Sequence, residues 1–317
     1  MIEAAPLREA LVARARLLER CRHFFAERGV LEVETPTLAQ ATVTDLHLAS
    51  LATHIAGRPG PYYLQTSPEY AMKRLLAAGS GDIYQICKVF RDDESGRHHN
   101  PEFTMLEWYR LGFDHRELMD EVEALLDSLL GSVLRAPAEY LTYRDAFQRV
   151  LGVDPHGAAV AELEALAVAR LGARGLDGER DTVLELLMGA LVGPALGAGR
   201  LTFVHEYPAS QAALARCLPG TPAVAARFEA YVGGLELCNG FHELADAAEQ
   251  RRRFEADRAL RAARGLPLPP VDERLLAALA RGLPDCAGVA LGLDRVLMLA
   301  LGRDTLAGVL AFPIADA

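Results

Sequence analysis

The sequence is poor in cysteine and has no long hydrophobic run. Its five cysteines are an odd number, lie far apart and form no CxxC pair, which argues against a disulfide framework or a zinc site and is typical of a protein from a reducing cytoplasm. The longest uncharged run, residues 186–199, contains one proline and four glycines and is shorter than the ~20 apolar residues that cross a bilayer. The first residues carry acidic and basic side chains at helical spacing and resemble no cleavable signal. We therefore expect a cytoplasmic protein without a membrane segment.

Positive charge is also scarce. The formal net charge is −10 at pH 7, and a surface that neutralises phosphates needs an excess of lysine and arginine, so the balance argues against a nucleic-acid-binding protein. One arginine-rich stretch, residues 251–264, is either the solvated face of a helix or a local basic patch. Apolar residues make up 51% and charged residues 24% of the 317 positions, which is ordinary for a soluble globular protein with a substantial core.

The most informative segment is a polar loop between two alternating stretches. Residues 82–91 and 102–110 alternate like strands, so the segment predicts an antiparallel hairpin with a charged tip. Side chains two apart point the same way, and one face of the second strand therefore carries Phe103, Met105, Glu107 and Tyr109. A carboxylate and a phenol on an otherwise apolar face are costly to bury unless a cationic or hydrogen-bonding group meets them. Arg91 at the loop entrance can grip a phosphate or carboxylate with its planar fork, so the hairpin predicts a pocket for an amine-bearing substrate beside a nucleotide.

The remaining pattern predicts an α+β fold in a single domain, residues 1–317. Helical periodicity marks residues 117–134 and most of 142–200, and Ser67 and Pro68 are the expected N-cap and first residue of another helix. Short strands with flanking helices and few βαβ units favour a mostly antiparallel sheet. The helical stretch at about 142–200 carries no recognisable chemistry, and we interpret it as an insertion that packs against the sheet.

Three segments, in order, resemble the motifs of class II aminoacyl-tRNA synthetases in their lysyl-type version. LLERCRHFFAERGVLEVETPTL, residues 17–38, resembles motif 1, which ends in a dimer-interface proline, here Pro36. FRDDE…HNPEFTMLEWY, residues 90–109, resembles motif 2, and GVALGLDRVLMLALG, residues 288–302, resembles motif 3. The resemblance covers nearly the whole chain and implies the class II catalytic core and a homodimer.

The resemblance also implies an ATP site. Arg91 resembles the motif 2 arginine that bridges the amino-acid carboxylate and the α-phosphate, and Arg295 resembles the motif 3 arginine on the γ-phosphate, so these two are the implied catalytic residues. The implied ATP-binding residues are Arg91, Asp92, Asp93, Asn100, Glu236, Leu237, Gly292 and Arg295. Which of the loop residues Arg97, His98 and His99 contacts ATP stays open.

The implied metal site consists of two acidic residues. Glu236 and Glu243 resemble the pair that holds Mg²⁺ against the phosphates, and carboxylates with phosphate oxygens suit this hard cation. The two are seven residues apart and would face opposite ways in an unbroken strand. The Asn239-Gly240 dipeptide between them is either a bulge that brings them together or a tight hairpin turn.

The implied amino-acid pocket is acidic and phenolic. Its residues are Ser67, Pro68, Glu69, Glu107, Tyr109, Glu243 and Ala290. A diamino acid carries two ammonium groups that need acceptors once desolvated, and such a site can reject an analogue without the side-chain amine by about 10⁴-fold. Ala290 stands where lysyl-tRNA synthetases usually have glycine. Its methyl group should crowd an α-amino group and favour a substrate whose amine sits one carbon further along.

Three phrases resemble the elongation factor P–(R)-β-lysine ligases more closely than any tRNA synthetase: TSPEYAMKRLLAAG, NPEFTMLEWYR and ELCNGFHELADAAEQ. This resemblance implies that ATP and (R)-β-lysine form an adenylate with release of pyrophosphate, and that the acyl group then passes to a lysine ε-amine of elongation factor P. It implies no tRNA substrate, because motif 1 starts within the first turns of the chain and leaves no room for an upstream anticodon-binding domain.

Three other interpretations make different demands on the residues. A truncated lysyl-tRNA synthetase-like enzyme that activates α-lysine needs a basic acceptor-stem surface, which the acidic balance disfavours. A class II asparagine synthetase needs a basic side-chain pocket in place of Glu107 and Tyr109. A non-catalytic, ligand-binding regulatory paralogue predicts damage to the two arginines or to the acidic pair, and the sequence retains all four residues.

Overall fold

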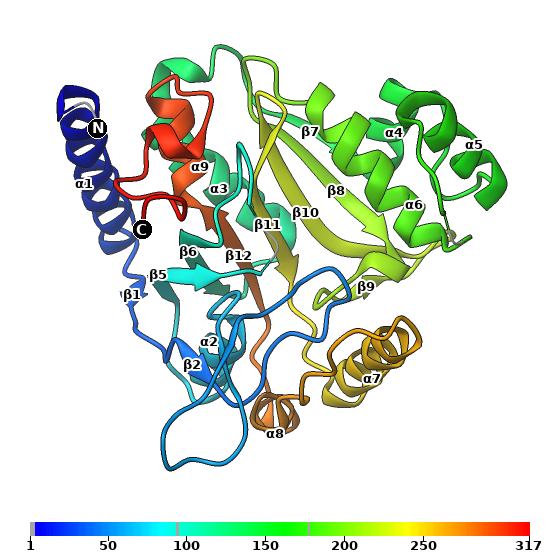
Figure 1. Cartoon of the computed structure of the whole chain (residues 1–317), viewed down its shortest axis with the longest axis horizontal. Helices are drawn as coiled ribbons and strands as arrows, with labels where there is room; N and C mark the ends of the chain where they lie inside the picture. Colours follow the sequence, from blue (N-terminus) through cyan, green and yellow to red (C-terminus); the bar gives the residue numbers. More distant parts are fainter. Residues whose placement is uncertain (1–3, 93–94, 177) are drawn as a thin grey trace.

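A mostly antiparallel sheet runs through the middle of the molecule (Figure 1). The computed structural model describes residues 4–92, 95–176 and 178–317, and within them the sheet has nine strands. In spatial order these are β1 (Leu31–Glu32), β5 (Ile83–Phe90), β6 (Glu102–Leu111), β12 (Cys286–Gly292), β11 (Leu235–His242), β10 (Val224–Val232), β8 (Thr202–Pro208) and β7 (Glu139–Thr142), with β9 (Cys217–Leu218) on β10. The edge pairs β1/β5 and β7/β8 are parallel, and the pairs between them are antiparallel. The predicted α+β class is confirmed.

One face of the sheet is covered by α1 (Ala4–Ala26), α3 (His115–Leu130) and α9 (Leu293–Ala300). Their apolar side chains form a core with Leu106, Trp108 and Phe228 of the sheet. The helix α3 starts at a capping box on Asp114, which satisfies backbone N–H groups that have no partner within the helix. The Trp108 indole donates a 3.0 Å hydrogen bond to Glu121 of α3, so the sheet and this helix are joined by a polar contact as well.

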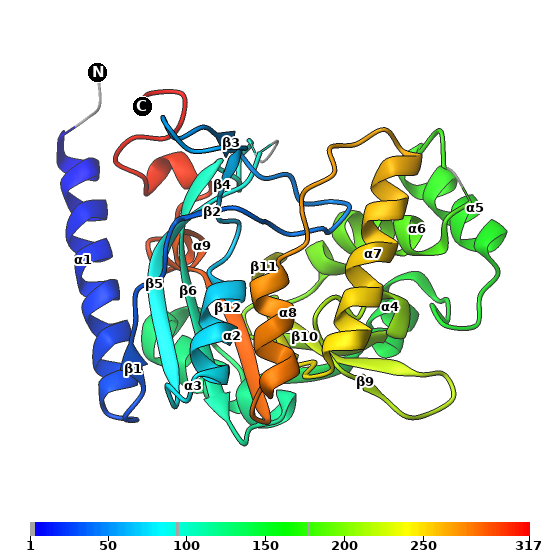
Figure 2. The same cartoon turned by 90° about the horizontal axis from the view of Figure 1, so that it is seen from below.

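The opposite face carries α2 (Glu69–Ala77), α7 (Ala247–Ala263) and α8 (Glu273–Arg281), which Figure 2 shows in front of the sheet. Apolar residues of these helices pack on Ile83, Tyr109 and Cys286. Pro68 occupies the N-cap position of α2, so the cap lies one residue later than the sequence predicts. The arginine-rich stretch falls largely on α7, where several guanidinium groups pair with Glu249 and Glu273.

The stretch predicted as a helical insertion lies at one end of the molecule (Figure 1). It contains α4 (Tyr143–Leu151), α5 (Val160–Leu171) and α6 (Arg180–Leu187), followed by the short helical turns η2 (Met188–Val192) and η3 (Gly193–Ala195). The helices share a core with Val204 and Tyr207 of β8.

The smaller elements complete the described chain. A second sheet has the order β2 (Leu38–Ala39), β4 (Tyr62–Leu64), β3 (Ala52–Thr53), and short turns lie at η1 (Gly131–Val133), η4 (Ala209–Gln211) and η5 (Leu306–Gly308). The segment between β2 and β3 is tied to α7, because Thr44 donates a 2.8 Å hydrogen bond to Asp257 and Arg261 donates to the Asp45 carbonyl. No helix within the described ranges has the length and apolar character needed to cross a membrane.

One row of side chains crosses five strands of the large sheet. The registers pair Glu229 with Asn239, Asn239 with Ala290, Ala290 with Glu107, and Glu107 with Gln85. Directly opposite residues of neighbouring strands share a face, so the row places polar groups across the middle of the face that carries α2 and α8. The candidate site is built along this row.

Candidate active site

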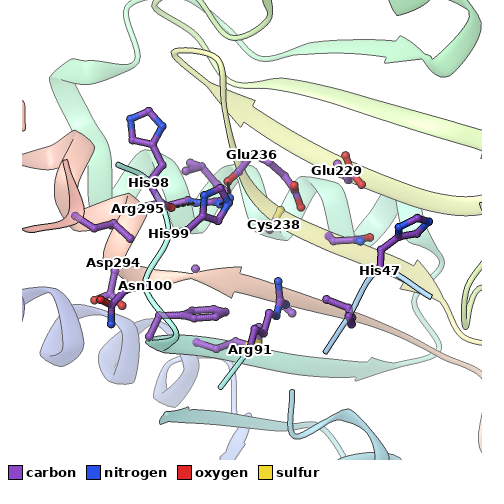
Figure 3. A pocket seen from close by; sticks show the side chains of 18 of the residues that line it. His47, Arg91, His98, His99, Asn100, Glu229, Glu236, Cys238, Asp294 and Arg295 are labelled. Atoms are coloured by element: carbon purple, nitrogen blue, oxygen red, sulfur yellow. Dashed lines mark hydrogen bonds between the residues drawn. The ribbon is translucent and has the colours of Figure 1, made fainter. Parts of the chain in front are cut away.

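A cavity of about 400 Å³ opens at one end of this row. Three arginines and five acidic residues line it, namely Arg91, Arg227, Arg295, Asp45, Glu185, Glu229, Glu236 and Asp294, and Figure 3 shows several of them around a common space. Of the predicted ATP-binding residues, six line the cavity: Arg91, Asn100, Glu236, Leu237, Gly292 and Arg295. Asp92 is engaged through its backbone, which donates to the Ala49 carbonyl at 2.9 Å, and Asp93 lies outside the described residues. A cavity with cations on several sides suits a polyanion.

Arg91 is positioned by the hairpin that the sequence predicts. It follows β5 directly, and its backbone N–H donates to the Pro101 carbonyl at 2.9 Å, which closes the base of the loop. The guanidinium carbon lies 5.1 Å from the centre of the Phe103 ring, within the range of a cation–π contact. Phe103 and Met105 line the cavity together, as expected for two residues that share a strand face.

Arg295 is held in the first turn of α9. It donates to the backbone carbonyl of Glu236 at 2.7 Å and to that of His98 at 3.3 Å, and its Nη2 lies 2.8 Å from His99 Nε2. One guanidinium thus joins the hairpin loop, β11 and α9 at the cavity wall (Figure 3). An arginine that is always charged is thereby fixed where a phosphate group could meet it.

The residues at the loop tip divide between two sites. Arg97 Nε donates to the Asp304 carbonyl at 2.9 Å, and His98 Nε2 lies 3.2 Å from the same oxygen. His99 instead contacts Arg295 in the cavity. Asn100 ties the loop together, because its amide donates to the Glu102 carbonyl at 2.6 Å and accepts from the Ile314 N–H at 3.0 Å. Among the three residues left open by the sequence, His98 and His99 both line the cavity, and Arg97 does not.

Glu236 lines the cavity together with Glu229, an acidic residue that the sequence did not single out. Glu229 is 6% exposed and is held by Arg227 at 2.6 Å and by the Tyr231 hydroxyl. Burial, together with the neighbouring Glu229, raises the pKa of Glu236 to about 7, and the cavity arginines only partly oppose this shift. Two carboxylates at close quarters beside a polyanion site are a donor set that fits Mg²⁺. No group of three or more His, Cys, Asp or Glu side chains suited to a metal occurs in the described part of the chain, so an ion here would need phosphate oxygens as well.

The structure does not bring Glu236 and Glu243 together, so the predicted metal pair is corrected. The extra residue in β11 is Leu237, because Ala230 pairs with Cys238 and Tyr231 pairs with Glu236. This bulge puts both glutamates on one face, but they remain roughly 20 Å apart along the strand at ~3.3 Å per residue. Asn239 and Gly240 lie inside β11 and form neither the bulge nor a hairpin turn. The chain reverses instead at Gly233 and Gly234, both with positive φ.

Glu243 belongs to a second, acidic pocket under α2. Its carboxylate is 2.5 Å from Nζ of Lys73, which also contacts Glu69 at 2.5 Å. Glu107 accepts hydrogen bonds from the Ser67 hydroxyl and the Tyr109 hydroxyl, each at 2.7 Å. The Ser67 oxygen also accepts from the Glu69 N–H at 3.0 Å, which fixes the start of α2 over the strand. The structure thus brings together the residues that were predicted to bind the amino-acid substrate. The exception is Pro68, which contributes only the N-cap of α2.

Burial changes the titration of this acidic pocket. Glu107 is 2% and Glu243 1% exposed. Burial and the nearby Glu69 raise the pKa of Glu107 to about 7, and burial raises the pKa of Glu243 to about 8 although Lys73 opposes the shift. Desolvated carboxylates of this kind recover stability when a cationic group meets them. The pocket is therefore suited to ammonium groups.

Two residues of β12 lie beside the acidic pocket. Ala290 lines the cavity and lies in register between Asn239 and Glu107, so it stands at the border of the nucleotide and amine ends. A Cβ on Gly288 would lie 2.2 Å from the Tyr109 ring and 2.6 Å from Glu243 Oε1. Glycine is therefore required at 288 for these two side chains to lie flat across the strand.

A further pair of residues at the cavity edge, His47 and Glu185, could not be recognised from a sequence pattern. His47, from the segment between β2 and β3, lies 3.0 Å from Glu185 of α6, and both residues line the cavity. Glu185 raises the pKa of His47 through this hydrogen bond. The contact joins the insertion to the segment over the cavity, and sequence periodicity gives no means to see such a pairing.

Comparison with known proteins relates the chain to one family. The family model for tRNA synthetases class II (D, K and N) matches residues 2–316. Curated proteins named elongation factor P–(R)-β-lysine ligase, from Salmonella dublin, Salmonella paratyphi B and Salmonella heidelberg, are each 53% identical over 312 residues, which is 96% of this chain and 94% of the relative.

Proposed function

The chain belongs to the class II tRNA synthetase family (D, K and N), and we propose that it is an ATP-dependent ligase that joins (R)-β-lysine to elongation factor P. In the first step a carboxylate oxygen of (R)-β-lysine attacks the α-phosphorus of ATP and pyrophosphate leaves. In the second step a lysine ε-amine of elongation factor P attacks the adenylate carbonyl, the carboxyl–phosphate bond breaks and AMP leaves. The relatives carry this activity in their name, and nearly the whole chain matches them.

The cavity supports the adenylation step. Arg91 and Arg295 approach it from β5 and α9 and are fixed by the contacts described above. Glu229 and Glu236 would hold Mg²⁺, which when bound offsets phosphate charge. The side chains otherwise act by positioning the carboxylate and phosphates and by offsetting developing charge.

The acidic pocket supports a diamino substrate, and this observation carries the proposal. Glu69, Glu107 and Glu243 lie together near Ala290, which pairs with Glu107 across the sheet, and two of the three glutamates are almost fully buried. A substrate with two ammonium groups would pair these carboxylates, whereas an acidic or neutral side chain would leave them desolvated. The methyl group of Ala290 would favour a β-amine over an α-amine.

We also propose a cytoplasmic homodimer that does not use tRNA. Leu31 of β1, within the segment that resembles motif 1, is 56% exposed, and Leu11 of α1, six residues before that segment, is 48% exposed; a second copy would cover both. The acidic net charge of −10 disfavours a tRNA surface. The five cysteines are free, which fits a reducing compartment.

The decisive experiment is ATP–pyrophosphate exchange with (R)-β-lysine, α-lysine and aspartate side by side. We expect rapid exchange with (R)-β-lysine, followed by a mass increase of elongation factor P equal to one lysyl group. An Arg295→Ala variant should lose exchange and serves as the control for contaminating synthetases. A clear preference for α-lysine, or exchange with no transfer to elongation factor P, would contradict the proposal.

A further inference from the structure

One enclosed cation lies in the wall of the acidic pocket. Lys73 is 1% exposed, and its Nζ is 2.5 Å from both Glu69 Oε1 and Glu243 Oε2. Lysine is almost never fully buried unless it is paired. The chain uses arginine for nearly all of its basic side chains, and Lys73 and Lys88 are its only lysines. A cation inside a pocket that is suited to cations needs an explanation.

The charges of the pocket can be counted. Glu69, Glu107 and Glu243 supply three negative charges when ionised, and Lys73 cancels one of them. The side chains beside them add no charge near neutral pH, because burial raises the pKa of Cys286 to about 12 and that of Tyr109 well above its usual range. Two net negative charges therefore remain once all three carboxylates are ionised, as they would be when ammonium groups displace their protons.

The groups on the outer side of Glu243 leave this count unchanged. Arg216 Nε donates to the backbone carbonyl of Glu243 at 3.1 Å, and its charge is matched by Asp285 at 2.6 Å. His242 lies 3.0 Å from the same Asp285. These charges pair with one another at the protein surface, so the balance inside the pocket is set by the three glutamates and Lys73.

Lys73 is the group that keeps its charge. Burial alone would lower the pKa of Lys73, but Glu243 and Glu69 outweigh burial and raise it above its ordinary value. Without this cation, three carboxylates would face one another in a desolvated space, and each would bind protons more strongly. A pocket filled with protons in this way no longer attracts ammonium groups.

We propose that Lys73 is a positioning residue that sets the amine specificity of the pocket. It acts through Glu69 and Glu243, cancels one of three buried negative charges and leaves two for the two ammonium groups of the substrate. This inference rests on the proposed function, which supplies the diamino substrate. An analogue with one ammonium group leaves a buried carboxylate unpaired, and the pocket rejects it for that reason.

The test is Lys73→Met, with Lys88→Met as its matched control. Lys88 pairs with Glu102 at 3.3 Å on the surface, where the two side chains are 49% and 47% exposed. The control loses the same charge and gains the same side chain outside the pocket. In ATP–pyrophosphate exchange at pH 7, we expect the KM for (R)-β-lysine to rise about tenfold or more in Lys73→Met, since at least one additional proton must be displaced on binding. We expect no change in Lys88→Met.

A pH series and a second substitution separate charge from shape. In Lys73→Met, KM should keep falling by about tenfold per pH unit up to about pH 9, because one proton is released on binding. The wild type and Lys88→Met should level off near the pKa of Glu243, about 8. The double variant Glu69→Gln/Lys73→Met again has two net negative charges and should recover most of the lost affinity and the wild-type pH profile.

Each outcome decides a different point. A KM in Lys73→Met equal to that of Lys88→Met overturns the inference, and so does a raised KM that responds neither to pH nor to Glu69→Gln. If Lys73→Met fails to fold, Glu69→Gln alone leaves one negative charge and should lower the preference for (R)-β-lysine over (R)-3-aminohexanoic acid by about tenfold or more. An unchanged preference overturns the inference in that case. Lack of exchange by the wild type would instead refute the proposed function.

Discussion

Replacing Arg14 by methionine should destabilise the cavity wall, although Arg14 belongs to α1, a helix outside the cavity. Arg14 of α1 reaches Asp294 with 2.5 Å between Nη2 and Oδ1, and it donates to the Val309 carbonyl at 3.2 Å. Asp294 is 2% exposed, lines the cavity beside Arg295 and accepts the Thr104 N–H at 2.7 Å. In Arg14→Met this carboxylate is buried without its cation, at the point where α9 and β6 meet.

The size of the effect follows from burial. Removing one partner of a buried ion pair costs about 3–5 kcal/mol, and the lower end applies because Arg14 is 20% exposed. At about 2 °C per kcal/mol for a chain of this size, the melting temperature should fall by roughly 6 °C. The KM for ATP should rise, because Asp294 no longer fixes the first turn of α9, which carries Arg295.

Thermal melts and exchange kinetics with varied ATP test this prediction. The control is Glu9→Gln, which breaks the 2.6 Å pair between Glu9 and Arg303, two side chains 57% and 39% exposed; a surface pair contributes at most about 1 kcal/mol. Adding Asp294→Asn to Arg14→Met removes the unpaired charge and keeps an acceptor for the Thr104 N–H, so it should recover about half of the stability or more. A loss in Arg14→Met no larger than that of Glu9→Gln would refute the reasoning.

Three further predictions concern the site itself. Glu229→Gln should raise the Mg²⁺ concentration for half-maximal exchange by about tenfold or more, since Glu236 would be left alone to hold the ion; an unchanged Mg²⁺ titration would count against this pair. Ala290→Gly should relax selection against α-lysine, and an identical ratio of the two lysine isomers in exchange would contradict the role given to the methyl group. The raised pKa values of Glu107 and Glu243, about 7 and about 8, mean that the empty folded pocket binds protons that the unfolded chain releases above about pH 4.5. The stability that these groups contribute is therefore lost as the pH rises towards 8. The increase in melting temperature caused by (R)-β-lysine should grow between pH 6 and 8. An increase in melting temperature that stays constant across that range would disprove the assignment.

Local pattern was enough to predict the motif 2 hairpin and its functional face. The alternation of side chains along a strand assigns Glu107 and Tyr109 to one face, and this assignment needs no knowledge of the neighbouring strands. Arg91 and Arg295 lie at the ends of regular elements, where a motif fixes their position. These residues are where the sequence predicts them because their geometry depends on a few adjacent residues.

The proposed metal pair, Glu229 and Glu236, could not be predicted in this way. The extra residue in β11 is Leu237, and nothing in its neighbourhood distinguishes it from an ordinary strand residue, whereas Asn239 and Gly240 carry a strong turn signal and lie in regular pairing. A bulge depends on the partner strand β10, which the local sequence does not describe. The partner of Glu236 was missed for the same reason, since Glu229 lies across the hairpin.

The sequence pattern around Lys73 fits an exposed ion pair as well as it fits a buried one. Glu69 and Lys73 are four residues apart on a helix, a spacing that usually marks an exposed ion pair. Only the packing of α2 on the sheet turns this pair inward. Burial of a charged side chain is a tertiary property, and it is settled by residues such as Glu243 that are far away in sequence.

The row from Glu229 to Glu107 fixes the distance between the cavity and the acidic pocket. It crosses the strands at right angles, over three strand spacings of ~4.8 Å, or roughly 14 Å. That distance is set by backbone hydrogen bonds between β10, β11, β12 and β6. Side-chain substitutions along the row can therefore change which chemical groups are accepted at each position, while the spacing of the strands stays the same.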